Sequence, residues 1–193
     1  MINRANTDVR KALLLFKNWE GWAPAGLTLL WWLSALLIDP TGDFPVFDDW
    51  HYGLLVRSLY EEGRFVLWDD ISPNLFLQPF WGWLFCWIAG SFSFLWLRLS
   101  TLVLGWISVL LVFSLLRTSH NQARPAFWGA LTLAFCPIFF LLSPTFMTDI
   151  PFLTCCLASL WAFDRFLRSG TSGFRFAAYL FALAAYLTRL PGI

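Results

Sequence analysis

The sequence is short of charged residues and of side chains that bind metals. Charged residues make up 13% of its 193 positions, whereas soluble domains contain about a quarter. It holds only two histidines, and the net charge is +1. No stretch is basic enough to follow a nucleic-acid backbone, so we expect no nucleic-acid partner. The low charge content instead predicts a protein that lies largely in a membrane.

The four cysteines form neither a metal site nor a disulfide framework in the sequence. They lie inside apolar runs, and no histidine or carboxylate stands at metal-ligand spacing from them. Disulfide frameworks belong to small secreted domains. We therefore interpret the cysteines as small, polarizable packing residues. They are Cys86, Cys136, Cys155 and Cys156.

Apolar and aromatic side chains, in contrast, are abundant. Hydrophobic residues make up 59% of the chain, with 13 tryptophans and 21 phenylalanines. A helix that crosses a membrane needs about 20 mostly apolar residues. We therefore predict an all-α, polytopic transmembrane protein that forms a single domain over residues 1–193. The predicted apolar helices are Gly21–Ile38, Leu99–Leu116, Pro125–Ser143 with a kink at Pro137, Thr145–Phe163 and Phe176–Leu187.

The N-terminal 20 residues are basic and precede the first apolar helix. That helix is longer than the apolar region of a secretory signal, and no small-residue cleavage site follows it. We expect an uncleaved first span, with residues 1–20 in the cytoplasm. The basic residues ahead of it are Arg4, Arg10, Lys11 and Lys17.

An acidic segment follows the first span and contains a short amphipathic helix. The predicted helix is Asp49–Glu62, in which Arg57 and Glu61 form an i,i+4 pair and Gly63 is placed as the C-cap. The helix is too short and too charged to cross a membrane, so we expect it on the membrane surface. Its apolar residues at helical spacing are Trp50, Leu54, Leu55 and Leu59.

The aromatic-rich stretch Leu75–Leu97 decides the predicted topology. If it crosses the membrane, the basic loops around Arg117 and Arg165 lie on the extracytoplasmic side. That placement conflicts with the rule that short basic loops stay in the cytoplasm. If it lies in the interface, both loops share the cytoplasmic face with the N-terminus. We therefore predict that residues 39–98 form an extracytoplasmic, interfacial loop with amphipathic juxtamembrane helices. Three carboxylates then share the extracytoplasmic face: Asp48, Asp49 and Asp149.

These carboxylates have two interpretations. Asp48 or Asp49 can cap the helix that follows, because an aspartate there accepts an orphan backbone N–H. Thr148 or Asp149 can do so for the helix that opens at Ile150-Pro151, since a proline fits the first turn of a helix. Alternatively, an ionisable residue at the edge of a span marks a functional site. Two acidic sites on one membrane face suit an enzyme.

Several short motifs, taken in order, resemble the N-terminal part of the GT-C membrane glycosyltransferases. This group includes protein O-mannosyltransferases, the aminoarabinose transferases of lipid A and Rgt-type galacturonosyltransferases. The motifs are Asp48-Asp49-x-x-Tyr52 after the first span, Leu59-x-x-x-Gly63-x-Phe65, Gln78-Pro79, Arg98-Leu99-Ser100, and Met147-Thr148-Asp149-x-Pro151, which looks like the second acidic site of the group.

The resemblance implies a sugar on a polyprenyl phosphate as the donor, and a glycan, lipid or protein as the acceptor. The reaction would occur on the extracytoplasmic side of a membrane, for which we expect the bacterial inner membrane. Asp48 or Asp49 would take the proton of the acceptor hydroxyl, which attacks the anomeric carbon with inversion, and Asp149 would complete the catalytic carboxylates. A guanidinium would bind the leaving phosphate. The predicted phosphate- and substrate-binding residues are Arg98, Tyr52, Gln78 and Arg189.

Some alternatives stay open at this level. The sequence indicates no definite cofactor, although Asp48, Asp49 and Asp149 could together hold a divalent metal ion. The alternative function is a transporter or flippase of lipid-linked sugars, because carboxylates within a membrane also carry protons and cations. The related enzymes have more spans, so we expect this chain to be an N-terminal fragment, with its own activity in question.

Overall fold

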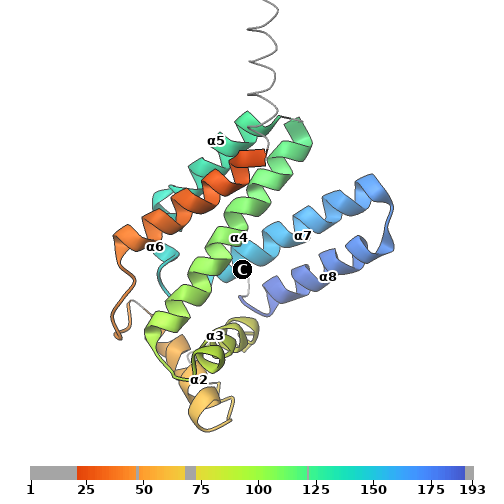
Figure 1. The fold of residues 1–193 in the computed structure, drawn as a ribbon. Helices are drawn as coiled ribbons and strands as arrows, with labels where there is room; N and C mark the ends of the chain where they lie inside the picture. The colour runs from red at the N-terminus through yellow and green to blue at the C-terminus, as the bar shows by residue number, and fades with distance from the viewer. Residues whose placement is uncertain (1–20, 47, 68–72, 121, 190–193) are drawn as a thin grey trace, which may run out of the picture.

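A computed structural model describes residues 21–46, 48–67, 73–120 and 122–189, and the regular structure in these ranges is all helical. The predicted all-α fold class is thus confirmed. The first described helix is Gly21–Ile38, and it is followed by α2 (Asp49–Glu61), α3 (Leu77–Ala89), α4 (Phe94–His120), α5 (Ala123–Ala134), α6 (Pro137–Leu142), α7 (Asp149–Ser169) and α8 (Ser172–Tyr186) (Figure 1).

Three of the described helices are long and apolar enough to cross a membrane. They are Gly21–Ile38, Phe94–Ser119 and Asp149–Ser169. At a rise of about 1.5 Å per residue, 20 residues cover the roughly 30 Å hydrocarbon core. The chain is therefore a polytopic integral membrane protein.

The prediction of one kinked helix over Pro125–Ser143 is wrong. The chain instead forms two helices, α5 and α6, with a break between them. Cys136 adopts an extended conformation, with φ −60° and ψ 124°. The ring of a proline disfavours the helical conformation of the residue before it, so Pro137 starts a new helix instead of bending the old one. The helix predicted from Thr145 likewise begins only at Asp149.

The end of the first described helix and the start of α4 lie together at one end of the bundle. Arg98, near the start of α4, donates hydrogen bonds to the carbonyls of Pro40 and Gly42. The segment between these helices, with α2 and α3, therefore leaves and returns at the same end (Figure 1). Gly90, at φ +74°, ends α3 after 13 residues, or about 20 Å. This length favours the predicted interfacial position of residues 75–97, which stays a prediction.

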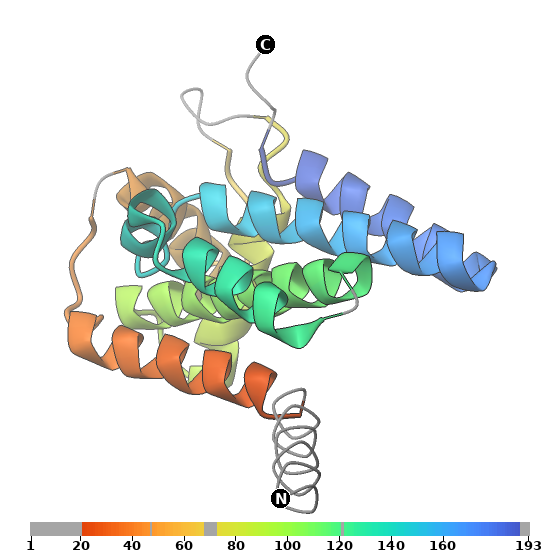
Figure 2. The ribbon, with the colours of Figure 1, turned by 90° about the horizontal axis from the view of Figure 1, so that it is seen from above.

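Helix α4 lies at the centre of the larger core, against the first described helix, α5 and α7 (Figures 1 and 2). Four of the five buried residues of α5 are alanines, and two of these, Ala126 and Ala130, are fully buried. Small residues let helix backbones approach closely, which increases dispersion contacts where lipid removes the hydrophobic driving force.

Polar side chains inside the bundle are paired between helices. The Trp31 indole donates to the carbonyl oxygen of Leu102 at 3.1 Å, joining the first described helix to α4. The Ser108 and Thr154 hydroxyls lie 2.8 Å apart and join α4 to α7. An unpaired polar group in apolar surroundings costs several kcal/mol, so these bonds favour one register between the helices.

A smaller core joins α2, α3 and α4 to the segment between α6 and α7. Its fully buried members are Val56, Cys86, Leu97 and Phe146. Each comes from a different one of these segments. The smaller core therefore connects the surface helices to the loop that precedes Asp149.

Substitution of Gly82 tests this smaller core. An alanine Cβ at this position would lie 2.5 Å from the Phe146 ring and 2.9 Å from Leu97. Both neighbours are fully buried, so Gly82→Ala should lower the free energy of unfolding by about 1–3 kcal/mol through overpacking. Thermal unfolding in detergent measures this loss. The control is Gly173→Ala in α8, where nothing lies within 4 Å of the added atom; equal stability of the two variants would contradict the packing.

Candidate active site

The loop before α2 is held against the start of α4 by one buried arginine. Arg98 is 3% exposed, and its Nη1 donates to the carbonyls of Pro40 at 3.1 Å and Gly42 at 3.0 Å. Its Nη2 donates to the carbonyl of Phe44, and the guanidinium carbon lies 4.9 Å from the centre of the Phe44 ring. Arg98 thus organises a loop in this structure, although we predicted it as a phosphate ligand.

Asp43 provides a second attachment of the same loop. Its Oδ1 accepts hydrogen bonds from the Ser93 hydroxyl at 3.0 Å and from the Phe94 backbone N–H at 2.8 Å. Phe94 is the first residue of α4, so Asp43 satisfies an orphan N–H of that helix from a distant part of the chain. Sequence reasoning missed this role, because no local spacing links residues 51 positions apart.

Asp49 is fully buried and bonded to the backbone on both sides. Its Oδ1 accepts from the Val46 N–H at 2.6 Å, and its Oδ2 accepts from the Phe146 N–H at 3.4 Å. Burial raises the pKa of Asp49, while these two hydrogen bonds and the charge of Arg98 act in the opposite direction. Asp49 therefore connects the start of α2 to the segment before α7.

Gln78 of α3 binds the other backbone polar group of the same residue, Phe146. Its Nε2 donates to the Phe146 carbonyl at 2.6 Å, so the backbone N–H and the carbonyl of Phe146 are both held by buried side chains. The Gln78 Oε1 is also buried, and it has no hydrogen-bond partner within the described part of the chain. In this structure Gln78 holds the segment that leads to Asp149.

Three of the predicted site residues lie close enough to a fourth, Tyr52, for their charges to act on its hydroxyl. Arg189, just after α8, forms an ion pair with Asp149 at the start of α7. Burial raises the pKa of Tyr52; the charges of Asp48 and Asp149 also raise it, while that of Arg189 lowers it. Asp48 is exposed, in contrast to its buried neighbour. The structure thus brings Asp48, Tyr52, Asp149 and Arg189 into one cluster.

The helix-capping interpretation of the carboxylates is not supported. Asp48 occupies the N-cap position of α2, but it makes no side-chain capping hydrogen bond. Thr148 occupies that position for α7 and makes none either. The acidic residues at these helix starts are thus directed to the cluster and to neighbouring segments.

The end of α8 is fixed to the start of α3, which places Arg189 in the cluster. The Leu187 carbonyl accepts from the N–H groups of Phe76 at 2.9 Å and Leu77 at 3.0 Å, and the Asn74 side chain donates to the Tyr186 carbonyl. The last carbonyls of a helix have no partner inside it, and here they pair with a segment more than 100 residues away. We did not predict this contact from the sequence.

A divalent metal held by the three aspartates does not fit the described geometry. Within the ranges that the structure describes, no three His, Cys, Asp or Glu residues are grouped closely enough to hold a metal ion. Both oxygens of Asp49 accept backbone hydrogen bonds, and Asp149 is paired with Arg189.

The protein is an integral membrane protein with a polar site at one end of its helix bundle. This site contains the cluster of carboxylates and arginine.

A family model described as dolichyl-phosphate-mannose-protein mannosyltransferase matches residues 75–193, more than half of the chain. The chain belongs to this family, which is a GT-C glycosyltransferase family, so the resemblance seen in the sequence is confirmed. The match includes Gln78, Arg98, Asp149 and Arg189 and begins after Asp48-Asp49. Searches of curated proteins and of solved structures found no match.

Proposed function

We propose that the protein transfers a sugar from a polyprenyl-phosphate-linked donor to an acceptor hydroxyl. The family description names a mannose on dolichyl phosphate as donor and a protein as acceptor, and this supports a lipid-linked hexose as the donor class. The apolar spans fit a donor whose hydrocarbon chain lies in the bilayer. The polar cluster at the end of these spans is where the sugar phosphate of such a donor would lie.

The different surroundings of the two adjacent aspartates carry the proposal. Asp49 is fully buried and its two oxygens accept backbone hydrogen bonds, whereas Asp48 is exposed beside Tyr52. We therefore assign the general base to Asp48 and a positioning role to Asp49. The acceptor oxygen forms its bond to the anomeric carbon with inversion, its proton passes to Asp48, and the bond to the phosphate oxygen breaks.

The leaving lipid phosphate needs a cation, and Arg189 fits this role. A guanidinium can bind two phosphate oxygens at once. Asp149 holds Arg189 beside Tyr52 and Asp48 through the ion pair. Arg98 and Gln78 bond to backbone carbonyls, and for them we propose a positioning role in place of direct phosphate binding.

We propose that the cluster faces the extracytoplasmic side of a bacterial inner membrane. The loops between α4 and α5 and between α7 and α8 lie at the ends of these helices away from the cluster. Five arginines lie within α4, α5, α7 and α8 near these helix ends, and short basic segments between spans stay in the cytoplasm. These arginines are Arg117, Arg124, Arg165, Arg168 and Arg175.

Removal of the Arg189 charge should weaken the leaving-group contact. A hydrogen bond to a charged group contributes about 1.5–3 kcal/mol, so Arg189→Gln should lower kcat/KM for the lipid-linked donor by about 10- to 150-fold. The side chain is half exposed, and we expect the folded amount of the variant to stay unchanged. Initial rates at several donor concentrations measure the effect. Unchanged kcat/KM would exclude Arg189 as the phosphate ligand.

The donor class is tested by comparing two sugar donors. Membranes containing the protein are incubated with labelled mannose on a polyprenyl phosphate, or with the same sugar on a nucleotide. We expect labelled acceptor, together with free polyprenyl phosphate, from the lipid-linked donor alone. A flippase would move the donor between leaflets without releasing polyprenyl phosphate, and that result would contradict glycosyl transfer.

A further inference from the structure

The C-terminal end of α8 and the N-terminal end of α3 satisfy each other's backbone groups (Figure 1). The N–H groups of Phe76 and Leu77 donate to the Leu187 carbonyl at 2.9 Å and 3.0 Å. Leu77 is the first residue of α3, so its N–H has no partner inside its own helix. The negative end of one helix dipole also meets the positive end of the other. We call this contact the α3–α8 junction.

Asn74 adds a side-chain bond to the junction. It is 7% exposed, and its Nδ2 donates to the Tyr186 carbonyl, 112 positions away. The carbonyls of Leu183 and Ala185, in contrast, accept N–H groups from the residues that directly follow α8. The last turn of α8 therefore takes one of its bonds from a side chain of the segment before α3.

The junction determines where Arg189 lies. Arg189 follows Leu187 by two positions, and Thr188 between them is 1% exposed. The Arg189 N–H donates to the Ala185 carbonyl at 3.2 Å, so its backbone is held by the end of α8. From this position the guanidinium pairs with Asp149 at the start of α7.

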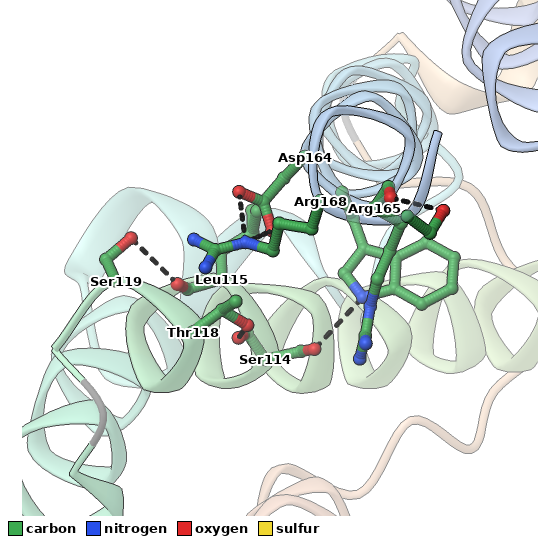
Figure 3. Close-up of polar contacts among 9 residues, drawn as sticks. Ser114, Leu115, Thr118, Ser119, Asp164, Arg165 and Arg168 are labelled. Atoms are coloured by element: carbon green, nitrogen blue, oxygen red, sulfur yellow. Dashed lines mark hydrogen bonds and ion pairs between the residues drawn. The ribbon is translucent and has the colours of Figure 1, made fainter. Parts of the chain in front are cut away.

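An ion pair near the other end of α7 forms without such a junction. Asp164 and Arg168 pair at 2.9 Å (Figure 3), and they are four positions apart, which places them side by side on one helix. Asp149 and Arg189 are 40 positions apart and come from different segments. Their pairing therefore depends on the placement of the end of α8.

We propose that Asn74 is a positioning residue for Arg189. The proposal rests on the proposed function, in which Arg189 binds the leaving phosphate. Asn74 fixes the end of α8 to the start of α3 and so holds the guanidinium in the cluster. A misplacement of about 1 Å can cost about 100-fold in rate even when the mutation lies far from the chemistry. A buried amide at the junction thus controls the leaving-group contact.

The kinetic test compares Asn74→Leu with and without Arg189. The substitution removes the donor and keeps a side chain of similar size, and it should lower kcat/KM for the lipid-linked donor by about tenfold or more. In the Arg189→Gln background it should cost less than about twofold, whereas independent sites would give the same factor in both backgrounds. Asn74→Gln keeps an amide donor and should recover part of the loss.

The matched control for this comparison is Ser159→Ala. The Ser159 hydroxyl donates to the Ala178 carbonyl of α8 at 2.9 Å, so the variant also removes a bond to an α8 carbonyl, but one away from the junction. We expect its kcat/KM for the same donor to change by less than about twofold, because the site is distant from the cluster.

Cross-linking tests the position of residue 189 without sugar transfer. Asp149→Cys/Arg189→Cys is treated with a short bifunctional thiol reagent, and mass spectrometry identifies the linked peptides. Adding Asn74→Leu should slow this cross-link by about threefold or more, because a helix end that loses tertiary contacts opens locally. The control is Asp164→Cys/Arg168→Cys, whose cross-link within α7 should form at the same rate with or without Asn74.

Two results would overturn the proposal. Equal losses of kcat/KM with and without Arg189 would mean that Asn74 does not act through this arginine. An unchanged cross-linking rate between positions 149 and 189 would mean that Asn74 does not hold the end of α8. Normal kcat/KM in Arg189→Gln would instead refute the phosphate role of Arg189, and cross-linking alone would then decide the positioning. If Asn74→Leu does not fold, Asn74→Ser, with a side chain too short for the Tyr186 carbonyl, replaces it under the same criteria.

Discussion

Asp48→Asn should reduce sugar transfer by about 10² to 10⁴-fold, the usual contribution of a general base. The amide cannot accept the proton of the acceptor hydroxyl, so the hydroxyl would attack without deprotonation. The Asp48 side chain is exposed and makes no capping hydrogen bond. The variant should therefore fold and insert as before, and transfer from the lipid-linked donor measures the loss.

Asp49→Asn is the matched comparison, because it makes the same change at the next residue. An asparagine there keeps one acceptor and turns an N–H₂ group toward the N–H of Val46 or Phe146. We expect a lower thermal midpoint and less folded protein, since a buried N–H loses its partner. Near-normal transfer by Asp48→Asn with a stable fold would reject Asp48 as the base. Loss of transfer by Asp49→Asn without loss of stability would move that assignment to Asp49.

Arg98→Met should be the most destabilising of the substitutions considered. It removes the donor to the carbonyls of Pro40, Gly42 and Phe44, and Arg98 is 3% exposed. Removal of one partner of a buried charged network costs about 3–5 kcal/mol. The expected result is a large drop in folded protein, measured by thermal unfolding and by protease resistance in detergent.

Two further variants separate the loop contacts of Arg98 from its charge. Arg98→Lys keeps the charge, but an ammonium group does not reproduce the fork of a guanidinium, so we expect intermediate stability and reduced kcat with an unchanged KM for the donor. Arg57→Met removes an exposed arginine that pairs with Glu61 at 3.0 Å, and it should cost less than about 1 kcal/mol. A raised donor KM in Arg98→Lys, with normal stability, would instead favour direct phosphate binding.

Local patterns in the sequence were enough to predict the helices and their approximate order. Apolar runs are encoded residue by residue, so the fold class and the three candidate spans follow from composition and length. The short helix α2 also follows from local signals: Arg57 and Glu61 pair as predicted, and Gly63 adopts φ +66° just after the helix. The position of the break at Pro137 was predicted correctly, but its form was not, because a proline can either bend a helix or end it.

Only the tertiary structure distinguished the surroundings of the site residues. Asp48 and Asp49 are chemically identical neighbours, and the sequence offered no reason to separate them. The burial of Asp49 and its bond to Phe146, 97 positions away, depend on how the segment before α7 folds back onto α2. Arg98 and Gln78 likewise bond to the backbone of distant segments. Helical periodicity reports which residues share a face, whereas the partner of each polar group is set by long-range contacts between loops.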